Sequence, residues 1–443
     1  MKFKTIEELL EYTKNIKGKT FKEIDTEGLL KTANLRQQKG LLGHVVETGF
    51  YKYPINNDSN ADFEELGVEL KVTGYVKNQN GSLRAKERVV LSKINFNQII
   101  NETFETSHVL GKCEKMLLIW YEYDKEKEAK DFIITDYQLY DMNLDKQIFE
   151  NDFEIIKGKV IEGKAHEISE GDTSYLGACT KGRKSSDRTT QPFSDIMPKP
   201  RAYSLKNSYM TGILRNNVEQ PKLITFSNFT TVEGYIKDKL MPYFGKTQLE
   251  IYEDITNEPY IKKIPKNFSK MISDKLIGKD KELPEKDDLF TKTRFIIKNT
   301  SLNKNGTPKE RLSFRNLRLN EFDEQWETSE WKQFFEEITI ILICYIAENN
   351  AKNGYRKLHS VKKVSFSGEE IDLFEKTYNQ TKLAIEKRDI NLLPISLNGF
   401  KHNELELAPR GNKGDKYENF FKTNTTKTCF MISKELVNKK LQE

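Results

Sequence analysis

Residues 61–75 constrain the fold of this chain more than any other segment, because their apolar and polar side chains alternate. Apolar residues at positions 68, 70 and 72 are separated by Glu69, Lys71 and a threonine. This period of two is typical of a β-strand with one buried and one polar face. Since residues i and i+2 of a strand point to the same side, Glu69 and Lys71 share the polar face. Asp62 lies seven residues before Glu69, across a Leu-Gly corner, and can approach them.

Two carboxylates and one ammonium group at the start of a buried strand are what metal-assisted hydrolysis of a phosphodiester needs. Carboxylate oxygens are hard ligands of the kind that Mg²⁺ prefers. A lysine can orient or help to deprotonate the attacking water, and it offsets developing charge. We therefore predict that Asp62 and Glu69 bind Mg²⁺ and that Lys71 orients the water. The pattern alone is weak evidence, because an ExK pair on a strand is usually solvated charge.

Four other segments accompany this one along the chain, at residues 39–50, 104–112, 174–182 and 200–214. They read KGLLGHVVETGF, FETSHVLGK, SYLGACTKG and PRAYSLKNSYMTGIL. Together with DFEELGVELK they resemble the MutH/Sau-type nucleases of the PD-(D/E)xK superfamily, closely over the first half of the chain and more loosely over the rest. That family contains the mismatch-repair nickase MutH and the larger Sau-type type II restriction endonucleases, both of which act at GATC.

The resemblance implies further groups at the catalytic centre. The main-chain carbonyl of Leu70 becomes a third oxygen ligand of the metal. Glu47 matches an additional glutamate that holds metal-bound water or a second ion, and Lys112 matches a second lysine near the scissile phosphate. From the residues alone, Glu47 could equally be a surface charge of its helix, and Lys112 an extended side chain at a strand end.

The resemblance also implies which residues contact DNA. Lys181 matches a loop lysine that contacts bases, where a basic side chain can read the O6 and N7 atoms of guanine. Arg183 and Lys184 would add phosphate contacts. Ser204 stands where MutH has a tyrosine that senses adenine methylation, so we expect cleavage at GATC to be indifferent to N6-methyladenine. A cognate methyltransferase, the expected genetic partner, would then have to mark cytosine.

A weak internal repeat relates the two halves of the chain. Residues 68–92 and 295–314 each contain an apolar segment with a lysine, an Asn-Gly turn and KER before a second apolar segment. FETS at residues 104–107 and WETS at residues 326–329 follow in the same order. We interpret these segments as two copies of one domain.

The copies differ at the predicted metal ligands. Aligning Lys298 with the lysine of the first copy places Ile296 at the position of the glutamate and Leu289 opposite the aspartate, with Asp288 one residue out of register. An isoleucine cannot bind Mg²⁺, so the second copy should not cleave. The Sau-type enzymes resemble this arrangement, with a catalytic first domain and a noncatalytic regulatory second domain; a purely structural role is the alternative.

The predicted fold is α/β, with a mixed sheet flanked by helices in each of two tandem MutH-like domains. We expect a catalytic domain at residues 1–216, a linker at 217–233 that contains a proline and a Thr/Asn/Ser cluster, and a noncatalytic regulatory or DNA-binding domain at 234–443. Patterns in the first domain predict helices at residues 6–14, 39–51 and 153–170, and strands at residues 68–73, 87–95 and 116–123.

The composition of the chain argues against several classes of protein and site. The 72 basic and 67 acidic residues give a net charge of +5, too mild to prove a nucleic-acid partner. The four cysteines show no CxxC spacing, which argues against a zinc site and a disulfide framework. We find no apolar run long enough to span a membrane and no apolar signal core at the N-terminus. The expectation is a cytoplasmic protein without a membrane partner.

These observations predict a Mg²⁺-dependent type II restriction endonuclease that cuts double-stranded DNA at GATC. One catalytic centre per chain predicts a monomer that dimerises on DNA. The second domain is expected to bind a further DNA site and to raise activity. Two alternatives stay open: a MutH-like mismatch-repair nickase at GATC, and a noncatalytic sequence-specific DNA-binding protein.

Overall fold

The structure is a computed structural model in which the chain forms two compact units. One unit comprises residues 1–168 with 172–222, and the other comprises residues 169–171 with 223–443. The residues that the structure describes are 2–32, 40–53, 60–77, 81–124, 126–182, 186–218, 231–278, 295–400, 404–410, 421 and 427–443.

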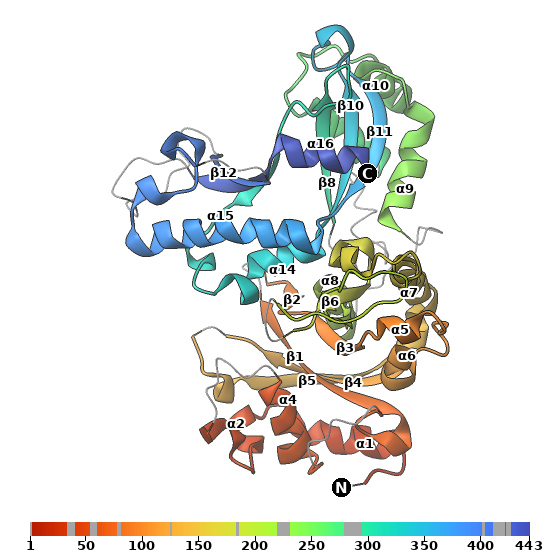
Figure 1. The fold of residues 1–443 in the computed structure, drawn as a ribbon, viewed down its shortest axis with the longest axis vertical. Coiled ribbons are helices and arrows are strands. Elements are labelled where there is room, and N and C mark those ends of the chain that lie inside the picture. Colours follow the sequence, from red (N-terminus) through yellow and green to blue (C-terminus); the bar gives the residue numbers. More distant parts are fainter. Residues whose placement is uncertain are drawn as a thin grey trace. The chain divides into compact units, whose positions relative to one another are not determined.

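The first unit is built on a mixed sheet with the strand order β2-β1-β4-β5 (Figure 1). Its central pair, β1 (Val68–Lys77) and β4 (Lys115–Glu122), is parallel. The flanking strands β2 (Leu83–Ala85) and β5 (Ile133–Asp141) are antiparallel to their neighbours. The sheet therefore places the first residues of β1, including Glu69 and Lys71, beside the start of β4.

One face of this sheet packs against the N-terminal helices. Leu70 of β1 and Leu117 and Ile119 of β4 share a core with side chains of that helical layer. The layer contains α1 (Ile6–Thr13), α2 (Phe21–Ile24), α3 (Leu29–Thr32), α4 (Leu41–His44) and a π-helix at Val45–Phe50. The predicted helix at 39–51 thus changes from α to π geometry after four described helical residues.

A second, antiparallel sheet of the first unit has the strand order β3-β7-β6. Its strands are β3 (Val89–Lys93), β7 (Arg201–Leu205) and β6 (Leu176–Thr180). Figure 1 shows these strands among α5 (Phe96–Ile99), α6 (His108–Cys113), α7 (Lys146–Ile161) and α8 (Asn207–Val218). One or two helices are predicted at 153–170, and the structure has α7, which begins earlier, followed by a 3-10 helix at Ala165–Glu167.

Among its described residues the second unit repeats most of this strand arrangement, but its first sheet has three strands rather than four. In its first sheet, β8 (Phe295–Leu302) is parallel to β10 (Thr339–Ile346), and β11 (Lys357–Val364) is antiparallel to β10. Its second sheet has the order β12-β13-β9, with β9 (Leu312–Asn316), β12 (Leu405–Pro409) and β13 (Thr428–Ile432). Its helices are α9 (Val232–Leu240), α10 (Gln248–Thr256), α11 (Phe268–Leu276), α14 (Glu330–Glu337), α15 (Gly368–Lys387) and α16 (Lys434–Gln442).

Buried side chains of β10 alternate between two cores. Ile341 and Ile343 pack with α9, α10 and α11, whereas Ile340 and Leu342 pack with α14 and α15. Helices therefore cover both faces of a mixed sheet, and the predicted α/β class is confirmed. In the part of the chain that the structure describes, no helix combines the length and the apolar character that crossing a membrane requires.

Candidate active site

A tight corner brings Asp62 back to the start of β1. The Phe63 N–H donates to the Val68 carbonyl at 2.9 Å, and the Val68 N–H donates to the Phe63 carbonyl at 3.3 Å. Between them lies a 3-10 turn, Glu64–Leu66, followed by Gly67 with φ of +62°. Glycine adopts this left-handed conformation without steric cost, which explains the Leu-Gly corner in the sequence.

Asp62, Glu69 and Lys71 meet at this corner, as the sequence predicts. The Leu70 N–H donates to Asp62 Oδ2 at 2.8 Å, and the Asp62 N–H donates to Glu69 Oε2 at 3.2 Å. Lys71 Nζ donates to Glu69 Oε1 at 2.7 Å. The Glu69 side chain is only 3% exposed. Main-chain hydrogen bonds thus fix the two carboxylates relative to each other before any ligand binds.

Lys112 and Glu47 approach the same centre from other elements. Lys112 lies near the end of α6 and its Nζ is 3.7 Å from Glu69 Oε1. The ETSH segment sets up this helix, because the Ser107 hydroxyl accepts the Leu110 N–H at the first turn. Glu47 lies on the π-helix, and the charges of Glu69 and Lys112 both influence its pKa. Such helical irregularities frequently occur at functional sites.

Burial and the charge of Glu69 raise the pKa of two carboxyl groups of this centre, those of Asp62 and Glu47. Burial, followed by the charge of Glu69, raises the pKa of Asp62 from 3.8 to about 6. Burial, followed by Glu69, also raises the pKa of Glu47. For Lys71, burial acts to lower the pKa, but Glu69 and the neighbouring acidic groups raise it above its ordinary value. Lys71 is therefore a stable ammonium group.

The charge balance of the centre favours a bound cation. Three carboxyl groups, from Glu47, Asp62 and Glu69, face two lysines, so full ionisation leaves a surplus of one negative charge. Among the described residues, no three His, Cys, Asp or Glu side chains converge as metal ligands. A metal would consequently depend on two carboxylates and the main chain, and an ion such as Mg²⁺ that retains several waters fits this donor set.

Of the predicted DNA contacts, Lys181 is exposed and Ser204 is buried. Lys181 follows the end of β6, is exposed, and its N–H donates to the Pro200 carbonyl at 2.7 Å. Arg183 and Lys184 lie outside the described residues. Ser204, in contrast, is fully buried, and its contact with DNA stays a prediction. All five residues of β7 are buried, so its side chains are covered on both faces of the sheet.

A buried carboxylate that the sequence did not identify supports the strand that precedes Lys181. Asp152 of α7 is 1% exposed and accepts three main-chain N–H groups, from Ser174 at 2.9 Å, Tyr175 at 2.7 Å and Leu176 at 2.9 Å. Buried Lys206 donates to the Thr173 carbonyl at 2.5 Å. Together these two side chains hold the start of β6, the strand that ends at Lys181.

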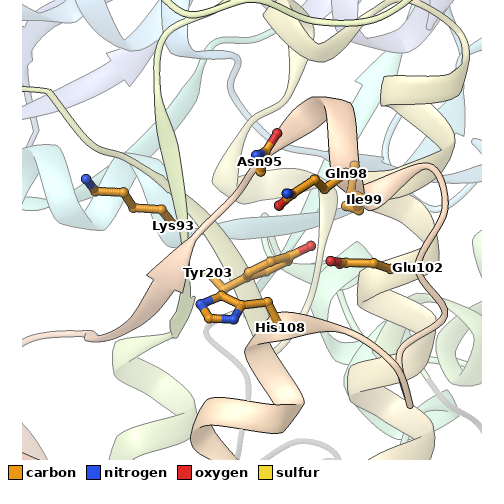
Figure 2. Close-up of a pocket in the computed structure, with 7 residues that line it drawn as sticks. All are labelled: Lys93, Asn95, Gln98, Ile99, Glu102, His108 and Tyr203. Carbon is orange, nitrogen blue, oxygen red and sulfur yellow. The ribbon is translucent and has the colours of Figure 1, made fainter. Parts of the chain in front are cut away.

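A separate small pocket lies at the beginning of α6 (Figure 2). It has a volume of about 190 Å³, and His108 and Tyr203 lie on its wall. Figure 2 shows the hydroxyl of Tyr203 directed toward the side of the pocket that carries Glu102. The pocket also includes Lys93, Asn95, Gln98 and Ile99. His108, which belongs to the ETSH segment, therefore lines a polar hollow four residues before Lys112.

Comparison with known proteins agrees with this geometry. The family model described as "DNA mismatch repair enzyme MutH" matches residues 51–156. The chain is 36% identical over 362 residues to the type II restriction enzyme Sau3AI of Staphylococcus aureus, covering 76% of this chain and 72% of that protein. It is 26% identical over 217 residues to the DNA mismatch repair protein MutH of Shewanella woodyi, covering 48% of this chain and 91% of that protein. The chain therefore belongs to the MutH/Sau-type family of restriction endonucleases.

Proposed function

We propose that this restriction endonuclease hydrolyses double-stranded DNA at GATC with Mg²⁺ as its cofactor. The observation that carries the proposal is the convergence of Asp62, Glu69 and Lys71 at the start of one buried strand. The similarity to Sau3AI over most of both chains supports the restriction role. An enzyme with this substrate would act in the cytoplasm, where cellular DNA is found.

Asp62, Glu69 and the Leu70 carbonyl would hold the metal, which, when bound, supplies a Lewis acid for a phosphoryl oxygen. Side chains of the centre position the attacking water and the scissile phosphate. Lys71 is fully charged, 19% exposed and tied to Glu69, so its ammonium group can hold a water in line with the phosphorus and stabilise developing negative charge. Lys112 stands 3.7 Å from the same carboxylate and can contact the scissile phosphate. Glu47 completes the acidic side of the centre and can accept a proton from water.

The direct test is a plasmid digest with Mg²⁺ in which the fragment ends are sequenced. Ends that all fall at GATC, and that disappear on chelation and in Glu69→Gln, support the proposal. Glu64→Gln is the matched control, because Glu64 is exposed in the adjoining turn and carries the same charge. Intact plasmid with the wild-type protein, despite specific binding in a gel shift, would favour a noncatalytic DNA-binding protein.

A mismatch-repair nickase is the second candidate, because the MutH relative matches nearly half of the chain. We consider it less well supported, since the similarity to Sau3AI extends through 76% of the chain. Double-strand breaks made by the purified protein alone favour the restriction role. Nicks that require a repair ATPase would favour the nickase.

Methylation provides a further test. Position 204 carries a small buried serine without an aromatic ring that could reach a base, so adenine-methylated and unmethylated plasmids should be cut at equal rates. Resistance of the methylated plasmid would contradict this expectation. Equal cutting would also require the host to protect its DNA by a different mark, which we propose is cytosine methylation by a cognate methyltransferase.

We further propose that residues 1–216 form the catalytic domain, 217–233 the linker, and 234–443 a noncatalytic effector domain. Ile296 of β8 stands where Glu69 stands in β1, and this supports the assignment. The counterparts of Asp62, Leu289 or its neighbour Asp288, lie outside the described residues. With one centre per chain, two monomers would meet on DNA to cut both strands.

A further inference from the structure

Residues 192–197, in the connection between β6 and β7 of the first unit, form a loop that exposes large apolar side chains; we call it the apolar loop. Phe193 is 70% exposed, Ile196 55% and Met197 51%. Single exposed apolar side chains are common on proteins and need no explanation. Three of them within five residues form a patch, and patches of this kind mark interaction sites.

The buried side chain of Gln191 closes the apolar loop and ties it to the rest of the unit. Its Nε2 donates to the Ile196 carbonyl at 2.6 Å, which joins the two ends of the loop. Its Oε1 accepts the N–H of Ala165, in the segment that follows α7, at 2.8 Å. The apolar side chains are therefore carried by a backbone that is fixed from inside the protein.

The backbone of the apolar loop is held in a conformation that costs free energy. Phe193 has a φ of +64°, in the left-handed region that is unfavourable for a bulky side chain. A Cβ atom on Gly163 would lie 2.7 Å from the Phe193 carbonyl oxygen, so a glycine is needed there for the loop to pack against the end of α7. Prolines at positions 192, 198 and 200 restrict the chain further. The loop thus presents apolar groups outward in one conformation, although a polar flexible loop would be less costly.

The apolar loop is continuous with the segment that contains Lys181, a predicted DNA contact. The Lys181 N–H donates to the Pro200 carbonyl at 2.7 Å, and the Thr189 N–H donates to the Pro198 carbonyl at 2.9 Å. The chain that leaves β6 and the chain that returns to β7 therefore run side by side on either side of the loop. Residues 181–200 include five basic and two acidic residues. An apolar patch within a basic segment fits DNA, whose phosphates surround apolar base edges and sugars.

We propose that Phe193, Ile196 and Met197 form an apolar wedge that presses against a base step of the DNA duplex bound by the first unit. This inference rests on the proposed function in taking DNA as the ligand. Apolar side chains that meet base steps partly unstack them and bend the duplex, and a rigid support is needed for the wedge to do so. Because the wedge contacts bases and sugars, it adds affinity without neutralising a phosphate.

The test measures the affinity for a labelled GATC duplex by fluorescence anisotropy over a series of salt concentrations, in the uncleaving Glu69→Gln background. Phe193→Gly combined with Ile196→Ser should raise Kd about 10–100-fold, since the apolar area of two large side chains is no longer buried. The slope of log Kd against log salt should stay unchanged. Lys181→Met should, in contrast, reduce that slope by about one unit, as expected for a lost phosphate or base contact by a cation.

A folding defect is separated from a lost contact by the choice of variants. Glycine adopts the left-handed conformation of position 193 without steric cost, so Phe193→Gly should leave the thermal midpoint undiminished. Leu144→Ser is the matched control, because Leu144 is another exposed apolar side chain of the first unit, at 76%. It should change neither Kd nor the slope.

The possible outcomes separate this inference from the proposed function. An unchanged Kd in the double variant would overturn the wedge, as would a weaker affinity accompanied by a reduced salt slope. If Kd is unchanged but sedimentation without DNA shows a dimer of the parent that the double variant no longer forms, the apolar loop binds a second copy of the chain and the DNA assignment is wrong. If the wild-type protein fails to cut at GATC but its affinity for duplex DNA still depends on Phe193 and Ile196, the wedge stands and only the catalytic assignment falls.

Discussion

Replacing Asp62 by asparagine should stabilise the metal-free protein at neutral pH while abolishing its stabilisation by Mg²⁺. The rise of the Asp62 pKa from 3.8 to about 6 means that the folded protein binds this proton more tightly than the unfolded chain. Ionising Asp62 therefore costs folding free energy, and stability falls as pH rises from about 4 to about 6. At about 1.4 kcal/mol per pKa unit, the cost at pH 7.5 is about 3 kcal/mol.

Asparagine avoids this cost and keeps an oxygen that can accept the Leu70 N–H, which now donates to Asp62 at 2.8 Å. For a unit of this size, about 3 kcal/mol corresponds to a rise of about 6–12 °C in the midpoint of the first unit's transition, and some loss of hydrogen-bond strength will reduce it. Differential scanning calorimetry in EDTA at pH 7.5 measures the rise. Below pH 4 the wild type and Asp62→Asn should have equal midpoints.

The control is Glu64→Gln, in the exposed turn beside Asp62, which should leave the midpoint nearly unchanged. Adding Mg²⁺ should raise the midpoint of the wild type and of the control, but not of Asp62→Asn, because only a site with both carboxylates binds the ion well. An Asp62→Asn midpoint equal to or below that of the wild type at pH 7.5 would refute the reasoning. It would mean that burial and the charge of Glu69 do not oppose the ionisation of Asp62.

Four other substitutions test the fold and the centre. Lys71→Met should reduce kcat about 10³-fold and Lys112→Met about 10–100-fold, since Lys112 is further from the carboxylate of Glu69. Single-turnover cleavage measures both losses, and equal losses would contradict this ranking. Asp152→Ala should destabilise the protein by about 3–5 kcal/mol in calorimetry, because three buried N–H groups lose their acceptor. An unchanged unfolding midpoint would show that these N–H groups find other partners. Glu370→Gln should lower the stability of the second unit at neutral pH but not at pH 3. Burial opposes the ionisation of Glu370, but Lys440 at 2.8 Å keeps its pKa below the usual value. The stabilisation by the ionised carboxylate is therefore lost as the pH falls. A loss that persists at pH 3 would contradict the ion-pair explanation.

Local patterns made the centre of β1 predictable. Period-two alternation and the chemistry of Asp62, Glu69 and Lys71 lie within ten residues, so both could be read from the chain. The π-helix that carries Glu47 could not, because its backbone differs from an α-helix without a sequence signature. The support of β6 by Asp152 joins residues 22 to 24 positions apart, and such main-chain contacts leave no trace in spacing. The burial of Ser204 could not be read from the sequence, because it depends on what packs on the two faces of β7.

Lys298 of the second unit is a residue that opposes the stability of its surroundings. An apolar residue at position 298 would stabilise the unit more, since this ionised side chain is partly buried and contacts no carboxylate among the described residues. Two positions earlier the chain carries such a residue, Ile296, and the sheet accommodates it. The fold therefore tolerates an apolar side chain at the glutamate position, while the lysine is present with Arg410 beside it. Local choices that oppose stability tend to occur at functional sites.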